Sequence, residues 1–377
     1  MKIGIMTFWW SNDNYGQLLQ CYALQKYLRD LGHEAYLIRY QLQGDCVKDP
    51  PPPLITKVYK ALNPIKVCKF VINKIKNYNK RHKLAQERKQ NSRLFELFRE
   101  KYIVQSPQTY NSLKELQSNP PEADIYIVGS DQVWNFYSVF DKLKTIAHAY
   151  FLDFGGDNIR RMSYAASWGR TEISDDEIKE LSPLLKRFDY ISVREESGIE
   201  LCKKCGCNDP EWVCDPTLLL DANTYRTIYN ENEIRKPESK YLLLYMLGNE
   251  CDFDVETVYD FAAKKGLEVV FVSGNNLIDS HQQYFATIPE WLYLVDNAEY
   301  VITNSFHCGV FSTIFHKQFG IIPLTGKLVG MNARMLSLFE LRGTDNRFVN
   351  GGEFVVLDKE YKVKDVKVSE KFFKYYA

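Results

Sequence analysis

The chain alternates short apolar runs with amphipathic stretches from its first residues onward. KIGIMTF predicts a buried strand, and residues 17–31 predict a helix with Leu24, Leu28 and Leu31 on one face. Gly32 is placed to end this helix, and EAYLIRY follows as a second apolar strand. The pattern therefore opens on a βαβ unit.

The alternation continues through the first half of the chain. Further strands are predicted at DIYIVG, AYFLDF, RMSYAAS and YISVRE, with a helix over residues 174–187 between the last two. Ser174 followed by Glu177 is a capping box. The acidic run SDDE is therefore interpreted as a helix start and not as a cluster of catalytic carboxylates.

After DPTLLL the pattern begins again. Strands are predicted at YLLLYML, EVVFVS, YVITNS and GIIP, with one helix ending at Gly266 and another beginning near Gly309. A chain of 377 residues is also long for one core. We therefore expect an α/β protein with two Rossmann-like domains facing each other across a cleft, residues 1–220 and 221–377. The terminal segment is a candidate for packing back on the first domain. No GxGxxG follows the first strand, which argues against a nicotinamide-dependent enzyme.

Composition narrows the class of protein. Lys and Arg number 48 and Asp and Glu also number 48, so no excess of charge points to nucleic acid. The amino terminus lacks the pattern of a signal peptide, and no apolar run reaches the roughly 18 residues of a membrane span. Nine cysteines suit a reducing cytoplasm better than a disulfide framework. Cys202, Cys205, Cys207 and Cys214 cluster, but no second ligand pair stands at zinc spacing, so free thiols are favoured and no metal is predicted.

One segment departs from the balanced charge. Residues 54–104 carry fourteen Lys and Arg against three Glu, with apolar residues between them. This pattern suits a basic helical insertion in the first domain that rests on an anionic membrane surface. The alternative is a solvated insertion whose apolar face packs on its own domain.

Polar residues gather where the predicted strands end, which is where open α/β sheets bind ligands. These residues are Asn14 and Gly16 after the first strand, Ser130, Asp131 and Gln132 after DIYIVG, Arg194 after YISV, and Ser305 and His307 after YVIT.

The segment VGSDQVWN allows two interpretations. Trp134 offers a flat apolar surface of the kind on which sugars stack. Alternatively, Asp131 caps the next turn and Trp134 belongs to the core.

Six segments together resemble the polysaccharide pyruvyl transferase family in order and spacing. They are NYGQLLQCYALQKYL, DIYIVGSDQVWN, SYAASWG, ISVREESG, VCDPTLLL and YVITNSFHCGVFSTIF, and the match extends from about residue 3 to residue 345. GSDQVWN and ITNSFHCGVFS are its most specific parts.

The resemblance implies a GT-B-like fold and a reaction. The enzyme would transfer the enolpyruvyl unit of phosphoenolpyruvate onto a hexose diol as a cyclic ketal, in the synthesis of capsule or another surface polysaccharide. The acceptor would be a hexose-containing glycan, commonly lipid-linked. No cofactor is expected beyond phosphoenolpyruvate as co-substrate. The expected location is the cytoplasm, with peripheral contact at the inner face of the plasma membrane.

The resemblance also places the donor site near Arg194 and His307. Some branches of the family carry Arg two residues before this histidine, where the present chain has Ser305. Another cation must then hold the donor, and Arg334, Lys327 and Arg161 are the candidates.

Roles for these residues follow from the implied chemistry. His307 is the expected donor of a proton to the methylene carbon, and Asp131 the group that takes a proton from the attacking hydroxyl. Phosphate and carboxylate suit a guanidinium, which is the expected role of Arg194. The remaining candidates are Ser305, Arg334 and Lys327 for the donor, and Asn14, Gly16, Ser130, Gln132 and Trp134 for the acceptor.

Alternatives stay open at each level. His307 could be a neutral residue of the interdomain seam or hold phosphate, and Arg194 could pair with Glu195 or Glu196. The protein could also be a GT-B-like glycosyltransferase that uses a nucleotide sugar, or a glycan-binding relative without turnover.

Overall fold

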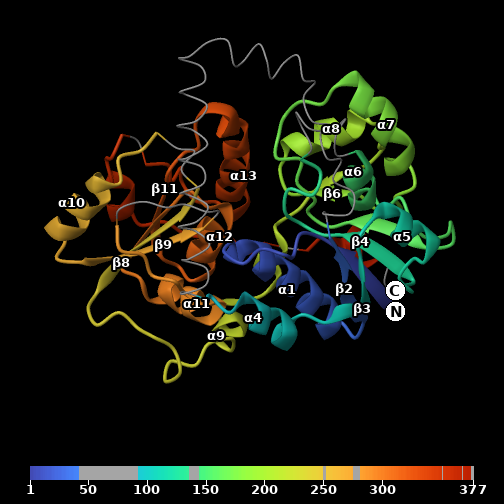
Figure 1. The fold of residues 1–377 in the computed structure, drawn as a ribbon. Coiled ribbons are helices and arrows are strands. Elements are labelled where there is room, and N and C mark those ends of the chain that lie inside the picture. The colour runs from blue at the N-terminus through green and yellow to red at the C-terminus, as the bar shows by residue number, and fades with distance from the viewer. Residues whose placement is uncertain are drawn as a thin grey trace, which may run out of the picture.

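Two parallel β-sheets form the framework of the molecule (Figure 1). The structure is a computed structural model that describes residues 1–41, 92–135, 144–248, 252–274, 281–349, 351–366 and 368–374. The first sheet has the strand order β3-β2-β1-β4-β5 and the second has the order β11-β10-β8-β9. A short pair, β6 and β7, follows the first sheet.

The strands of the first sheet are β1 (Lys2–Met6), β2 (Glu34–Tyr40), β3 (Gln105–Tyr110), β4 (Ile125–Val128) and β5 (Arg160–Ser163), followed by β6 (Ser192–Val193) and β7 (Glu211–Trp212). Those of the second sheet are β8 (Tyr241–Leu247), β9 (Glu268–Gly274), β10 (Tyr300–Thr303) and β11 (Gln318–Ile321). The central strands β1, β4, β8 and β10 are almost continuously buried. Their sequences are accordingly unbroken apolar runs, as parallel sheets covered on both faces require.

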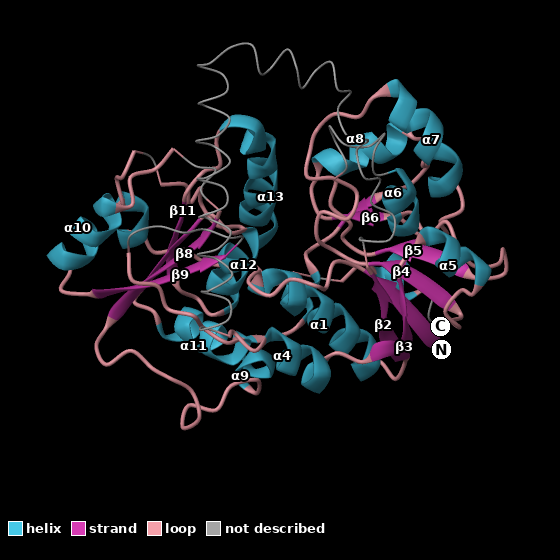
Figure 2. Cartoon of the chain, in the orientation of Figure 1, coloured by secondary structure: helices cyan, strands magenta, loops and turns pink. Residues whose placement is uncertain are grey.

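Helices cover these sheets (Figure 2). They are α1 (Tyr15–Asp30), α4 (Phe95–Tyr102), α5 (Leu113–Ser118), α6 (Lys144–Tyr150), α7 (Asp175–Leu185), α8 (Ser197–Lys204), α9 (Ala222–Arg226), α10 (Glu256–Lys264), α11 (Ile288–Asn297), α12 (Phe306–Ile314), α13 (Ala333–Arg342) and α14 (Glu370–Phe373). The 3-10 helices of the described part of the chain are η3 (Pro216–Leu219), η4 (Gly326–Asn332) and η5 (Val355–Asp358).

Helix α1 lies between the two sheets and connects their cores (Figure 1). Tyr15 stacks on Trp291 of α11 with 5.1 Å between ring centroids, and its hydroxyl donates to Ala286 O at 2.7 Å. Arg93, just before α4, donates to Ser273 O of β9 at 2.5 Å. One apolar cluster therefore runs from the first sheet through α1 into the second.

One predicted strand was wrong, one strand was missed, and one helix begins earlier than expected. AYFLDF is the end of α6 and a turn, not a strand. An apolar run this short has the same pattern in a buried helix and in a buried strand. QSPQTY forms the edge strand β3, which its polar residues and Pro107 conceal. Helix α12 begins at Phe306, three residues before Gly309, because Ser305 caps it.

The end of the described chain contacts the first half. Phe372 of α14 is fully buried against Tyr164 and Tyr190, with ring centroids 4.7 and 5.6 Å away. Lys371 pairs with Asp209 at 2.7 Å. The division at residue 220 falls between β7 and β8 and stays a prediction.

The basic insertion can be followed only in part. Residues 54–91 lie outside the described residues, and residues 92–104 pack on the first half through α4. The predicted membrane contact therefore stays a prediction. Within the described ranges, no helix has the length and apolarity that crossing a bilayer requires.

Candidate active site

A cavity of about 110 Å³ lies where strands of both sheets end. Its polar lining residues come from the segments after three strands. Asn14 comes after β1, Asp131 and Gln132 after β4, and Asn304 after β10. The remaining lining residues are Leu247, Ser305, Phe306, His307, Leu324, Leu328, Met331 and Arg334. All the strands concerned are parallel, so the loops after them converge on this point.

The amino terminus of α12 forms one wall of the cavity. Ser305 is the N-cap, and its hydroxyl accepts from Cys308 N at 3.4 Å. The next residues, Phe306 and His307, line the cavity. A helix amino terminus carries unpaired N–H groups and a partial positive charge, so this wall favours an anion.

His307 packs against helix α1 of the other half. A Cβ placed on Gly16 would lie 2.3 Å from both Cγ and Nδ1 of His307, so only glycine fits beneath the ring. Nε2 faces Asp215, with 3.4 Å to Oδ2. That distance is in ion-pair range, yet Nε2 is buried without a hydrogen-bond partner among the described residues.

Asp215 is the centre of a buried polar network behind the cavity. Oδ1 accepts from the backbone N–H of Thr217 at 3.0 Å and from its hydroxyl at 2.6 Å. Oδ2 accepts from the hydroxyl of Ser130 at 2.8 Å and from Nη1 of Arg194 at 3.0 Å. Each of these four groups donates to the carboxylate, and a protonated Nε2 of His307 would be a fifth donor.

The charges in this network stabilise one another. Burial raises the pKa of Asp215, but the nearby His307 and Arg194 outweigh this and hold the pKa well below its usual range. Burial lowers the pKa of Arg194, whereas the carboxylates of Glu195 and Asp215 produce a net rise. Both groups are therefore ionised at neutral pH.

Arg194 does not contact the cavity, which corrects its expected role in donor binding. Its side chain is 1% exposed and bonded to Asp215 and, through Nε at 3.3 Å, to Glu195. Its guanidinium carbon lies 4.4 Å from the centroid of the Phe306 ring. The salt bridge with Glu195 that was kept as the alternative is present.

Arg334 of α13 is the described arginine that lines the cavity. Its Nε donates to Met331 O at 3.0 Å, and its guanidinium carbon lies 5.8 Å from the Phe306 centroid. Nη1 and Nη2 have no hydrogen-bond partner within the described ranges. Burial and the charge of Arg194 lower the pKa of Arg334 to about 10, which leaves it charged at neutral pH.

The acceptor candidates divide into two groups. Asn14, Asp131 and Gln132 line the cavity; Asn14 caps α1 and Asp131 has a left-handed backbone with φ 74°. Trp134 is fully buried, stacks on Phe151 and donates to Tyr150 O, so the core interpretation was right and sugar stacking was wrong.

Ser130, Gly16 and Arg161 also lack the expected contacts. Ser130 is fully buried in the Asp215 network, and Gly16 supports the His307 ring instead of lining the cavity. Arg161 is buried on backbone carbonyls of residues 152–159. Lys327 belongs to η4, but its side chain lies outside what the structure describes.

Local reasoning missed two residues of this site. Asp215 stands in VCDPTLLL, where DPT signals a capped turn but not its neighbours in space. The apolar surroundings of Phe306 in the sequence indicate a core aromatic, although its ring contacts the guanidinium groups of both Arg194 and Arg334. Both arginines lie in other segments of the chain, so local sequence does not show these contacts.

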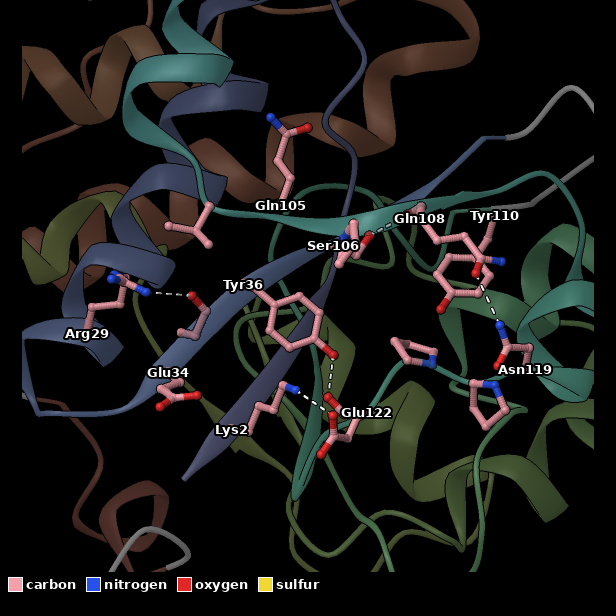
Figure 3. Close-up of a pocket in the computed structure, with 15 residues that line it drawn as sticks. Lys2, Arg29, Glu34, Tyr36, Gln105, Ser106, Gln108, Tyr110, Asn119 and Glu122 are labelled. Carbon is pink, nitrogen blue, oxygen red and sulfur yellow. Dashed lines mark hydrogen bonds and ion pairs between the residues drawn. The ribbon is translucent and has the colours of Figure 1, made fainter.

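A larger hollow of about 680 Å³ lies elsewhere (Figure 3). Lys2 and Glu34 place it at the amino ends of β1 and β2, beside the edge strand β3. Tyr36 and Lys2 there contact Glu122 at 2.7 Å each. It lacks the converging strand ends and helix amino terminus of the smaller cavity, so size alone does not identify the site.

The cysteine cluster holds free thiols in this structure. Among the described residues, no three His, Cys, Asp or Glu side chains are grouped as metal ligands.

Comparison with known proteins bears on the fold and on the family. The family model "Polysaccharide pyruvyl transferase" matches residues 14–324. No curated protein matches the chain. Among solved structures, UDP-GlcNAc 2-epimerase from Methanocaldococcus jannaschii, in complex with UDP-GlcNAc and UDP, is 13% identical with a TM-score of 0.53. The alignment covers 100% of this chain and 99% of that one.

Two further structures are more distant. UDP-GlcNAc 2-epimerase from Neisseria meningitidis, bound to UDP-GlcNAc, is 9% identical, with a TM-score of 0.44 over 95% of this chain and 89% of that chain. A glycosyltransferase from Streptomyces sp. SF2575 is 12% identical, with a TM-score of 0.35 over the same shares. The M. jannaschii likeness and the two parallel sheets confirm the predicted GT-B-like α/β fold.

Proposed function

Since the chain belongs to the polysaccharide pyruvyl transferase family, we propose that it transfers the enolpyruvyl unit of phosphoenolpyruvate onto a hexose diol as a cyclic ketal, in surface-polysaccharide synthesis. The observation that carries this proposal is that His307 and Arg334 line one cavity beside the amino terminus of α12, and that Nη1 and Nη2 of Arg334 have no hydrogen-bond partner among the described residues.

The donor substrate, phosphoenolpyruvate, is a small trianion, and the cavity offers it two positively charged groups. Nη1 and Nη2 of Arg334 would bind the phosphate or the carboxylate in bidentate fashion. The first N–H groups of α12, next to Ser305, would receive the other anionic end. Arg194 would support this arrangement from behind, through Phe306 and Asp215.

The chemistry begins with a proton. Protonated His307 would deliver it to the methylene carbon of phosphoenolpyruvate, which leaves a cationic centre at C2. One sugar hydroxyl attacks C2 and loses its proton to Asp131, the carboxylate that lines the cavity. Phosphate departs with its electron pair, and the second hydroxyl closes the ketal. One hydroxyl proton replaces that of His307 and the other leaves with phosphate.

The acceptor would lie on the side of Asn14 and Gln132, whose amides can bind sugar hydroxyls.

We propose that this acceptor is a lipid-linked glycan and that the reaction takes place in the cytoplasm without a further cofactor. Vesicles with anionic lipid should then retain the protein at low salt and release it as salt rises. Binding that is indifferent to both lipid charge and salt would remove the membrane part of the proposal.

Incubation with phosphoenolpyruvate and candidate glycans tests the reaction. The expected result is release of phosphate and a glycan heavier by one pyruvic acid minus one water.

Arg334→Gln should raise the KM for phosphoenolpyruvate about tenfold to a hundredfold, because a charge-assisted hydrogen bond contributes roughly 1.5–3 kcal/mol. Arg226→Gln, which removes an arginine bonded to Asp296 outside the cavity, is the matched control.

Nucleotide-sugar chemistry is the alternative that the fold allows. The cavity of about 110 Å³ is small beside the roughly 300–1,000 Å³ of sites that enclose drug-sized ligands, which favours a three-carbon donor. Release of a nucleoside diphosphate from a nucleotide sugar, with no phosphate from phosphoenolpyruvate, would overturn the proposal.

A further inference from the structure

We infer that Asp215 is the positioning residue of this site: it holds His307 with a proton on Nε2 and leaves Nδ1 as the nitrogen that exchanges a proton with the ligand. Asp215 is fully buried and lies outside the cavity lining, so it acts through His307 and not on the substrate. The inference deepens the proposed function and rests on it for its kinetic consequence.

The orientation of the carboxylate is determined from four directions. The backbone N–H and the hydroxyl of Thr217 donate to Oδ1, and Ser130 and Arg194 donate to Oδ2. The four donor–acceptor distances lie between 2.6 and 3.0 Å. Asp215 is also the N-cap of η3, which places its backbone. A carboxylate with this many fixed donors has little freedom to rotate, so Oδ2 stays directed at His307.

Acceptor capacity decides which tautomer the histidine adopts. An ionised carboxylate can only accept hydrogen bonds, and its neighbours hold the pKa of Asp215 well below its usual range. The group facing Oδ2 must therefore be a donor, so Nε2 carries a proton in both the neutral and the charged ring. The 3.4 Å separation is long for a hydrogen bond, as is common before substrate binds.

The other nitrogen then performs the proton transfer. Nδ1 lies above Gly16 and makes no hydrogen bond to a described residue. When the charged ring gives its Nδ1 proton to the methylene carbon, the neutral ring that remains already has the Nε2–H form that Asp215 favours. No second proton needs to move inside the protein.

The direct test is the nitrogen NMR spectrum of the ligand-free protein labelled with ¹⁵N at histidine, with His307 assigned by its absence in His307→Gln. The expected wild-type signals at high pH are a protonated Nε2 and an unprotonated Nδ1. In Asp215→Asn the amide cannot satisfy all the donors around it, and the two signals should move toward each other as both tautomers become populated.

Turnover provides the second readout. Asp215→Asn should lower kcat about 10²–10⁴-fold, the range for a misplaced acid or base, while the KM for phosphoenolpyruvate changes far less. Asp296→Asn is the matched control, because it removes another carboxylate paired with an arginine but remote from the cavity. It should change neither the His307 signals nor the ratio of kcat to KM.

The NMR signals and the turnover measurement distinguish a failure of the positioning role from a failure of the proposed function. If the His307 signals shift but no glycan is ever pyruvylated, the positioning role stands and the proposed function fails. If pyruvylation occurs and Asp215→Asn keeps both the wild-type signals and kcat, the positioning role is overturned. Should Asp215→Asn not fold, Thr217→Val removes one donor to Oδ1 and retains the charge. It should shift the same signals in the same direction by less, and unchanged signals would equally overturn the inference.

Discussion

The Cα atom of Gly16 lies so close to the His307 ring that any side chain at position 16 would occupy the same space. Gly16→Ala should therefore displace the imidazole without removing a chemical group from the cavity. We expect kcat to fall about 10²-fold or more, and overpacking to cost about 1–3 kcal/mol of unfolding free energy. Turnover and urea unfolding measure the two effects.

The control for this change is Gly330→Ala, since no atom lies within 4 Å of a Cβ placed there. It should leave both turnover and stability near their wild-type values. An alanine at position 16 that turned over normally would mean that His307 does not need its present place.

His148, which does not line the cavity, makes stability depend on pH. Its Nδ1 lies 3.0 Å from Asp153 and its Nε2 lies 2.9 Å from Glu180. The hydrogen bond to Asp153 is the largest cause that raises the pKa of His148, against an opposing effect of burial. A pKa raised in the folded state adds stability that is complete below the unfolded value of about 6.5 and is lost as pH rises through the folded value.

Urea unfolding at pH 5.5 and pH 9 measures this contribution. The wild-type protein should lose more stability than His148→Gln between these two pH values, by about 1 kcal/mol or less because the site is partly exposed. Equal losses in both proteins would contradict the assignment.

For single residues, the sequence predicted the residue types and chain positions of the site better than the directions in which their side chains point. The rule that ligands bind at strand ends identified Asn14, Asp131, Ser305 and His307, all of which line the cavity. The same rule included Arg194, whose side chain points into the Asp215 network instead. Whether a side chain after a strand turns outward or inward depends on partners from other segments, which local spacing does not contain.

Among the elements, helix α7 depends on its amino-terminal cap. The Ser174 hydroxyl accepts from Glu177 N at 3.3 Å, and the Glu177 carboxylate accepts from Ser174 N at 3.1 Å. Ser174→Ala should cost about 1 kcal/mol of unfolding free energy, because it removes the partner of a helix-end N–H. Ser182→Ala removes a hydroxyl inside the same helix that donates to Ile178 O and also bonds to Cys205, but it leaves every helix-end N–H with its partner and should cost less. Since α7 does not line the cavity, turnover should be unchanged in both variants.

Elements with their own capping or periodicity were predictable, and the others were not. The capping box of α7 and the glycine after α1 are encoded within a few residues. Strand β3 owes its existence to pairing with β2, and its own residues are polar. Helix α6 is an apolar segment in a core cluster, and only its surroundings decide between helix and strand.

For the whole molecule, the site exists because two halves meet around α1. The loop before α1 brings Asn14 to the cavity, and the helix brings Gly16 to His307. The same helix carries Tyr15, whose ring contacts Tyr245 and Trp291 of the second half. The alternation of strands and helices predicted two Rossmann-like halves, but only packing shows that one helix aligns them.

Gly274, the last residue of β9, tests this alignment from the second half. A Cβ placed there would lie 2.4 Å from the backbone oxygen of Asp13, directly before α1. Gly274→Ala should therefore push the start of α1 away from β9, because a backbone atom cannot yield as a flexible side chain can. We expect lower kcat through the displaced pair of Gly16 and His307, together with a destabilisation of about 1–3 kcal/mol.

Gly156→Ala is the matched control, because a Cβ there meets only the side chain of Asn158 within 3 Å. Turnover, unfolding and the ¹⁵N signals of His307 distinguish the possible causes. A shift of the His307 signals in Gly274→Ala, a residue that does not line the cavity, is expected if the packing of α1 sets the geometry of the site. Unchanged signals with normal turnover would mean that the contact between Gly274 and Asp13 does not set the geometry of the site.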